Sequence, residues 1–456
     1  MNWGNDVTNC LAYIESYWDK LIQKPTKKRI DRHIISIPHP YISPNDKKFT
    51  FIFYWDTFFM FKGIMGGPRE WIMKAMVENF AHLFETHHII PNFNAPASMG
   101  RSQPPFLSSM ILNTYETLTR STALTDSLRR LTAKVFYNSN ADKEWLLKMI
   151  LVAKKEYSYV WMDPQDVYHH RVAKFNLNRY GDRDLGYDHS SELESGWDFT
   201  SRFYNRASNF LPIDLNMYMY KYEKDFMTAA HILGDQVEKR LWRKQARKRA
   251  TTIQKLMWDK KKGFFFDYNY LSNRRSGFLS LAGFTPLWAG FASKSQAKKM
   301  VRKLKKFETD FGLAITAKES LAPLVNLSSI PSRYRHTIDA ILTPKQWDYP
   351  NIWPPLEYLT VIGLLQYGFV EDAKRIMEKS IKAHTKIFKK HRTLFERING
   401  ITGEKPKDFH YPTQAGFGWT NAIFYRYVKL LEAIEEKTLY AKPKSKIPPY
   451  ELAVLH

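Results

Sequence analysis

The sequence predicts an all-α protein built as a single domain, and three observations support this prediction. Apolar residues recur at helical spacing along most of the 456-residue chain, whereas patterns typical of strands are sparse. Hydrophobic residues make up 44% of the chain, which is enough for a sizeable core. Segments rich in Gly and Pro recur between the helical patterns, but none is long enough to be a linker between domains. We therefore expect paired helices that pack as a toroid or a solenoid.

The first clear helix begins at Pro68, because proline suits the first turn of a helix. Apolar residues then follow on one face, at Ile72, Met76, Phe80 and Leu83. This pattern predicts a helix that buries one side against a neighbour.

The remaining helices follow in order. Asp214 is a candidate cap for a helix that stops at Gly234. Further helical patterns cover residues 236–258, 293–307, 356–367, 371–388 and 420–436. The segment GFFFDY, residues 263–268, is the clearest candidate for a short strand. Residues 437–456 carry three prolines and several lysines, so we expect an extended tail after a domain of residues 1–436.

Charge and cysteine usage narrow the classes of function. The formal net charge is +24, which raises the question of a nucleic-acid partner. In the basic runs 242–249 and 298–306, apolar residues recur at helical spacing. We therefore predict solvated outer faces of amphipathic helices and no nucleic-acid partner. Cys10 is the single cysteine, which excludes an intrachain disulfide.

Targeting and cofactor motifs are missing from the sequence. The N-terminus has neither the basic nor the apolar region of a secretory signal, and the apolar stretch 359–365 is too short to span a bilayer. We expect a cytoplasmic monomer with no membrane association. The motifs HExxH, GxGxxG, GxSxG and the P-loop are also absent, so phosphoryl transfer, hydride transfer and serine hydrolysis lack their usual signatures. No metal or organic cofactor is expected.

Several loop segments combine polar side chains with aromatic rings, as sugar-binding sites do. The segment QWDYPNIWPP, residues 346–355, suits neither a helix nor a strand and is best explained as the lining of a cavity or a loop surface. FYWDTFF, residues 53–59, places Asp56 among aromatic residues, although a core segment is the alternative. In residues 91–105, Asn92 and Gln103 belong to a polar loop stiffened by prolines.

Two carboxylates are candidates for acid–base chemistry. Asp198 follows a Gly and a Trp in ESGWDFTSRF, and a partly dehydrated carboxyl beside a Trp should have the raised pKa that a general acid needs. A structural salt bridge between Asp198 and Arg202 is the alternative. Glu396, in the segment 394–420, could activate a water molecule, or could be a solvated loop residue.

Taken in order, these segments resemble the trehalases, glycoside hydrolase family 37, from about residue 10 to about residue 435. QWDYPNIWPP is similar to a trehalase signature almost residue for residue. Other similar segments occur in the family's order: GRSQPP, LNRY, ESGWDFTSRF, PIDLN, TPLWAG and GFGWTN. The resemblance implies an (α/α)6 toroid, or six-hairpin barrel, and hydrolysis of α,α-trehalose to two glucose molecules with inversion.

The resemblance also implies roles for individual residues. Asp198 corresponds to the general acid and Glu396 to the general base, and inversion needs their carboxyls to be about 6.5–9.5 Å apart. A small disaccharide is the implied partner. The residues expected to bind it are Lys48, Tyr54, Trp55, Asp56, Asn92, Arg101, Ser102, Gln103, Arg183, Gly196, Gln346, Trp347, Trp353 and His410.

Three parts of the sequence depart from the family's pattern. Lys48 replaces an arginine of the first signature and loses the bidentate fork, and Phe51 replaces a glutamate there. His410 stands where a sugar-binding glutamate is usual, and Ala95 where an arginine is usual. Two alternatives therefore remain open. One is a family 63-like α-glycosidase acting on glucosyl- or mannosyl-glycerate or another α-glucoside, and the other is a non-catalytic sugar-binding protein.

Overall fold

The computed structural model describes residues 3–25, 33–129, 139–165, 169–181, 188–321, 344–409 and 411–436. Helices dominate these ranges, as the sequence predicts. The expected tail, residues 437–456, lies outside the described residues. No helix in the described ranges combines the length and the apolarity that crossing a bilayer takes.

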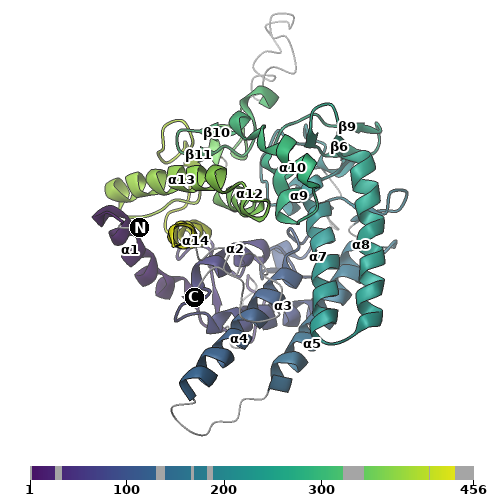
Figure 1. Cartoon of the computed structure of the whole chain (residues 1–456), viewed down its shortest axis with the longest axis horizontal. Helices are drawn as coiled ribbons and strands as arrows, with labels where there is room; N and C mark the ends of the chain where they lie inside the picture. The colour runs from purple at the N-terminus through teal and green to yellow at the C-terminus, as the bar shows by residue number, and fades with distance from the viewer. Residues whose placement is uncertain are drawn as a thin grey trace, which may run out of the picture.

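Six of the described helices form an inner ring, in which each helix contacts the next (Figure 1). The ring closes between its first and last members, which come from opposite ends of the chain. These helices are α2 (Tyr54–Ile64), α4 (Leu107–Arg129), α7 (Ile213–Ile232), α9 (Thr285–Trp288), α12 (Pro354–Gln366) and α14 (Gly418–Glu435).

An outer helix precedes each inner helix in the chain. Contacts join these outer helices to the inner ring or to one another, for example between α8 and α7, α13 and α12, and α1 and α13. The alternation of outer and inner helices confirms the predicted (α/α)6 toroid. The outer helices are α1 (Asn5–Leu21), α3 (Trp71–His87), α5 (Ser139–Glu156), α8 (Gln236–Leu256), α10 (Lys294–Val301) and α13 (Val370–His391).

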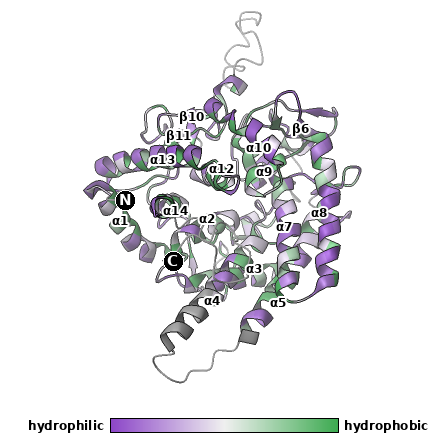
Figure 2. Cartoon of the chain, viewed as in Figure 1, coloured by the Kyte–Doolittle hydropathy of each residue, from purple (hydrophilic) through white to green (hydrophobic). Residues whose placement is uncertain are grey.

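Burial explains why the two rings differ in composition. All eleven residues of α2 are buried, so the helix is apolar around most of its circumference. In α8, by contrast, only Trp242, Ala246, Arg249 and Ile253 are buried, and the rest of the helix is polar (Figure 2). Close packing also constrains the closure of the inner ring. A Cβ at Gly63 would lie 2.5 Å from the Cα of Ala422. The backbones of α2 and α14 can therefore pack this closely only because residue 63 is a glycine.

Short strands connect the helices and are paired in antiparallel two- or three-stranded sheets. The predicted strand at residues 263–268 is divided between β7, which pairs with β6, and β8, which pairs with β5 and β9. The described strands are β1 (Ile22–Gln23), β2 (Tyr41–Ile42), β3 (Arg171–Val172), β4 (Leu177–Asn178), β5 (Phe210–Leu211), β6 (Trp258–Asp259), β7 (Phe264–Phe265), β8 (Tyr268–Asn269), β9 (Arg274–Arg275), β10 (Glu308–Thr309), β11 (Gly312–Leu313), β12 (Asn351–Ile352) and β13 (Ile398–Asn399).

Three helix predictions need correction. Pro68 lies in a turn and does not begin a helix, because α3 starts at Trp71. Asp214 does not cap α7, because Pro212 occupies the cap position and the Asp214 carboxylate binds Arg202 instead. The helix predicted for 293–307 ends early: α10 stops at Val301, and a short 3-10 turn follows at Leu304–Lys306.

Candidate active site

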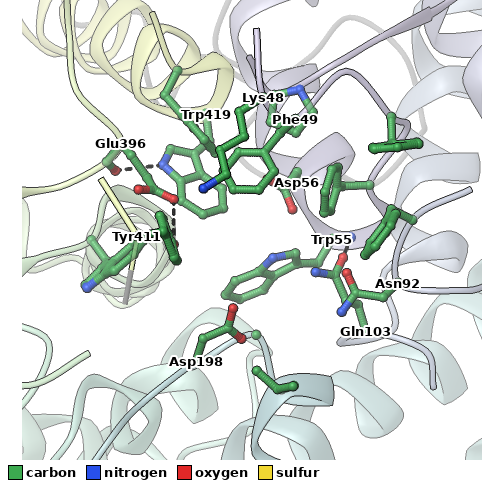
Figure 3. Close-up of a pocket in the computed structure, with 18 of the residues that line it drawn as sticks. Lys48, Phe49, Trp55, Asp56, Asn92, Gln103, Asp198, Glu396, Tyr411 and Trp419 are labelled. Carbon is green, nitrogen blue, oxygen red and sulfur yellow. Dashed lines mark hydrogen bonds between the residues drawn. The ribbon is translucent and has the colours of Figure 1, made fainter. Parts of the chain in front are cut away.

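A pocket of about 360 Å³ gathers side chains from five segments that are far apart in the sequence (Figure 3). These are the five segments in which the sequence pairs polar side chains with aromatic rings. The lining residues are Pro44, Lys48, Phe49, Phe51, Phe53, Trp55, Asp56, Asn92, Phe93, Arg101, Gln103, Leu193, Gly196, Asp198, Phe199, Trp347, Trp353, Glu396, Tyr411, Phe417 and Trp419.

Asp198 lies on one wall of the pocket, just beyond α6 (Asp188–Glu194). The chain turns into the pocket at Gly196, whose φ of 73° is left-handed. A Cβ at this glycine would lie 2.7 Å from the Trp55 ring, so the close approach also favours glycine. Burial raises the pKa of Asp198 to about 7. The nearby Arg101 opposes this rise and the charge of Glu396 adds to it.

The predicted alternative for Asp198, a salt bridge with Arg202, is wrong. The Arg202 guanidinium is fully buried and donates two hydrogen bonds to Asp214, at 2.7 and 2.8 Å. It donates two more to Asp267, both at 2.8 Å. The Arg202 guanidinium is thus hydrogen-bonded to these two carboxylates, and the Asp198 side chain lines the pocket instead.

Glu396 lies on another wall and is only 2% exposed, so it is not a solvated loop residue. Its Oε1 accepts a hydrogen bond of 2.9 Å from the Tyr411 hydroxyl, and its Oε2 lies 3.3 Å from Nη1 of Arg397. The Trp419 indole donates to the Glu396 carbonyl at 2.9 Å and fixes the backbone. Burial raises the pKa of this carboxyl to about 7, whereas Arg397, Tyr411 and Lys48 act to lower it.

A third carboxyl, that of Asp56, reaches the same pocket from the first turn of α2. The side chain is 4% exposed, and burial together with the charges of Glu396 and Asp198 raises its pKa well above the ordinary value. Burial raises the pKa of each of the three carboxyls, and repulsion among them adds to the rise at Asp56 and Asp198, which favours a protonated carboxyl in the pocket near neutral pH. An acid able to donate a proton fits this arrangement.

Four tryptophans form much of the apolar wall. Trp347 stacks on Trp353 with ring centroids 3.7 Å apart and planes within 8°. Trp55 lies 5.8 Å from Trp347, and Trp419 lies 5.9 Å from Trp353. Flat indole surfaces of this kind suit the apolar faces of a sugar ring, and the polar lining residues can bind its hydroxyls.

The Glu194 side chain links three of the segments that surround the pocket. Its buried carboxylate accepts hydrogen bonds from the backbone N–H groups of Ser102 and Gly181, at 2.9 and 2.6 Å. Nε2 of His170 lies 3.0 Å from both of its oxygens. The loop that carries Arg101 is thereby fixed to the turn that carries Asp198.

Three residues predicted to bind substrate do not line the pocket. Tyr54 points into the helix packing, where its hydroxyl donates to Glu156 at 2.8 Å. The Ser102 hydroxyl donates to the Ile90 carbonyl at 2.7 Å and is fully buried. Gln346 is buried beside the pocket, and its backbone carbonyl accepts from the Trp353 indole.

The structure brings most of the other predicted residues together. Lys48, Trp55, Asp56, Asn92, Arg101, Gln103, Gly196, Trp347 and Trp353 all line the pocket with Asp198 and Glu396. Arg183 and His410 lie outside the described residues. Sequence reasoning missed Tyr411, Trp419 and the rings of Phe49, Phe53, Phe93, Phe199 and Phe417. Their only sequence signal is proximity to the motifs already singled out.

Comparison with known proteins identifies a family for this chain and solved structures that share its fold. The family model described as trehalase matches residues 4–432. Neutral trehalase from Saccharomyces cerevisiae superimposes with a TM-score of 0.70 at 26% identity, covering 87% of this chain and 75% of that one. A family 63 mannosylglycerate hydrolase from Thermus thermophilus, solved with glucose, gives a TM-score of 0.61 at 14% identity, with coverages of 92% and 100%. A rhamnosidase from Klebsiella oxytoca shares the fold at a TM-score of 0.52 and 10% identity, covering 93% of this chain and 64% of that one.

Proposed function

The chain belongs to the trehalase family of glycoside hydrolases, and on this premise we propose that it cleaves α,α-trehalose to two glucose molecules with inversion. The observation that carries the proposal is the placement of Asp198 and Glu396 on different walls of one aromatic pocket (Figure 3). An inverting hydrolase needs an acid on one side of the scissile bond and a base on the other, with a water molecule between base and sugar.

The neighbours of the two carboxyls suggest which is the acid. Glu396 has the Arg397 cation and the Tyr411 hydroxyl beside it, and both favour its ionised form. Among the described residues, Arg101 is the cation that acts to lower the pKa of Asp198. When the site holds one proton for this pair, the proton is therefore more stable on Asp198.

The proposed reaction follows from these protonation states. Asp198 donates its proton to the glycosidic oxygen as the bond to the anomeric carbon breaks. Glu396 removes a proton from water as the water oxygen attacks that carbon from the opposite face. The glucose formed by attack leaves as the β-anomer, and the other leaves as the α-anomer.

The aromatic and polar lining supports a sugar as the substrate. The stacked rings of Trp347 and Trp353 would contact an apolar sugar face, and Asp56, Asn92 and Gln103 would bind hydroxyls. We assign no substrate role to Tyr54, Ser102 or Gln346, because their side chains do not line the pocket.

A second candidate substrate has support in one part of the pocket. Phe51 and Phe53 both pack on Phe93, with centroids 5.2 and 4.9 Å apart, so this part of the lining is apolar. A second glucose would leave hydroxyls unpaired against such rings. An α-glucoside or α-mannoside with a smaller or less polar leaving group is therefore the alternative.

Proton NMR of the reaction tests the proposal. Incubation with α,α-trehalose should yield equal initial amounts of α- and β-glucose, and the variant Asp198→Asn should yield neither. A parallel panel of glucosylglycerate, mannosylglycerate and an aryl α-glucoside tests the alternative. Hydrolysis of a panel member with no cleavage of trehalose would reject trehalose as the substrate. If no glycoside of the panel is cleaved, the result favours the non-catalytic sugar-binding alternative.

A further inference from the structure

The positive charge of the protein is concentrated in one part of the chain. Residues 236–306 contain 20 Lys and Arg and only three Asp and Glu, a net charge of +17 out of +24 for the whole chain. This segment runs from α8 to the end of the turn after α10, and all of it is described in the structure. The glycosidase pocket lies elsewhere and uses none of these residues.

The exposed face of α8 carries the densest part of this charge. Arg240, Arg243, Lys244, Arg247 and Lys248 are all exposed and flank one shallow hollow, and we call these five residues the α8 basic stripe. Their spacing of three and four residues places them on one side of the helix. The opposite side of α8, including Trp242 and Ile253, packs against the toroid and is buried.

No carboxylate within the described ranges forms an ion pair with any residue of the stripe. Two glutamates near the stripe form ion pairs with residues outside it: Glu238 with Lys154, and Glu223 with the buried Arg249. Like charges three and four residues apart destabilise a helix by roughly 0.2–0.5 kcal/mol per pair. The stripe therefore carries a cost that a bound anion would remove.

The basic surface continues beyond α8. Reciprocal hydrogen bonds between Gln254 and Gln296, at 3.3 and 2.8 Å, join α8 to α10. The Arg275 guanidinium donates to the Lys255 carbonyl, which brings β9 against the end of α8. A Cβ at Gly263 would lie 3.0 Å from the Lys299 side chain, so the lysine-rich turn after β6 packs on α10.

The linear density of charge indicates the class of partner. The five cations of the stripe lie within nine residues, Arg240 to Lys248, which corresponds to about 12 Å along the axis at a helical rise of ~1.5 Å per residue. Successive side chains of an extended acidic peptide point to opposite faces, so such a peptide presents one charge per ~6.6 Å to the stripe, about half of what the five cations need. Duplex nucleic acid carries one charge per ~1.7 Å of axis, which is sufficient. Insertion into a membrane is disfavoured, because the apolar side of α8 is already buried in the fold.

We propose that the α8 basic stripe binds the phosphate backbone of duplex nucleic acid without reading its sequence. The sequence pattern predicts a solvated helix face and no nucleic-acid partner, and the proposal departs from that prediction. The basic runs do lie on amphipathic helices. The sequence could not show that they form one continuous surface, or that the cations of the stripe lack carboxylate partners among the described residues. The proposal does not depend on the glycosidase activity.

Fluorescence anisotropy with a labelled 20-base-pair duplex tests the proposal. The full chain should bind at 50 mM salt, and the logarithm of its affinity should fall linearly with the logarithm of salt concentration. The triple variant Lys244→Gln, Arg247→Gln, Lys248→Gln should lose about 2–3 units of that slope, because each phosphate contact contributes ~0.9. Gln keeps the helix propensity, so the fold should be retained.

A matched variant controls for net charge. Lys382→Gln, Lys386→Gln, Lys389→Gln removes three exposed charges from α13, across the ring from α8 (Figure 1). It should bind the duplex with nearly the slope of the unmodified protein, and both variants should keep the unmodified glycosidase activity. Absence of duplex binding, or equal losses in the two variants, would overturn the proposal. So would tighter binding of the stripe to polyglutamate or to phosphatidylserine vesicles than to the duplex.

Discussion

Nη1 of Arg397 lies 3.3 Å from Oε2 of Glu396, and the arginine side chain has no exposed surface. The guanidinium also lies over the rings of Trp353 and Tyr411, at 5.0 and 5.5 Å from their centroids. A buried cation held in this way favours the ionised form of the neighbouring carboxyl. We therefore propose that Arg397 is a positioning residue that keeps Glu396, the proposed base, in its ionised form.

Replacing Arg397 with Met should shift the pH profile of hydrolysis. Loss of the cation raises the pKa of Glu396, so the base is protonated over a wider range and the acidic limb of kcat/KM moves up by about one pH unit. Arg397→Lys should restore most of the profile, because it restores the charge. A uniform loss of activity at every pH in Arg397→Met, with no shift of the limb, would contradict this role.

Replacing Asp198 with Asn should stabilise the fold while abolishing activity. Burial raises the pKa of Asp198 from 3.8 to about 7, so its contribution to stability is complete below pH 3.8 and is lost as the pH rises through 7. At pH 8 the variant should therefore unfold with a free energy about 1–2 kcal/mol higher than the unmodified protein. Urea denaturation at pH 5 and pH 8 measures this, and the gain should be smaller at pH 5.

Adding a methyl group at Gly196 should impair the site through Trp55. The new Cβ of Gly196→Ala would lie 2.7 Å from the ring, so Trp55 must move away from its position in the pocket. A displacement of about 1 Å in a catalytic site can cost ~100-fold in rate. We expect kcat/KM to fall by 10- to 100-fold.

Gly290 provides the control for that substitution. Its φ of 62° is also left-handed, but no atom lies within 4 Å of the position of an added Cβ. Gly290→Ala should lower the free energy of unfolding by ~1–2 kcal/mol, because alanine disfavours the left-handed backbone conformation. Gly196→Ala carries the same backbone cost. The kcat/KM of Gly290→Ala should be unchanged, and an equal fall in both variants would mean that backbone strain and not Trp55 is responsible.

Removing the buried cation of Arg202 should destabilise the protein strongly. Asp214 and Asp267 are buried with it, and Arg202→Leu would leave two carboxylates without their partner. Breaking a buried ion pair in this way costs about 3–5 kcal/mol. Urea denaturation should show this loss, and adding Asp214→Asn and Asp267→Asn to the variant should recover part of it.

The fold was predictable because long helices leave a strong periodic signal. The pattern of Ile72, Met76, Phe80 and Leu83 repeats over more than three turns of α3, all on its buried face. Apart from the segment 263–268, the described strands could not be located, because each contains only two residues and no alternation develops. The end of α7 at Gly234 was visible, but the role of Asp214 was not, because its partner Arg202 lies outside the helix.

The candidate site was predictable by segment more than by side chain. The FYWD motif correctly identifies the turn of α2 that contributes to the pocket, but neighbouring residues of a helix point about 100° apart. Trp55 therefore faces the pocket while Tyr54 faces Glu156. Tyr411 reaches Glu396 across 15 residues, a contact that depends on how the intervening loop folds and that no local pattern encodes.

The closure of the inner ring between α2 and α14 has a consequence for biosynthesis. Trp55 and Asp56, in the first turn of α2, are synthesised early on the ribosome, whereas Trp419, in the first turn of α14, is synthesised much later. Because the pocket takes residues from both helices, we expect a nascent chain to lack glycosidase activity until α14 has been synthesised. Glucose release would then report that α2 and α14 have packed together, and not merely that the chain has been synthesised.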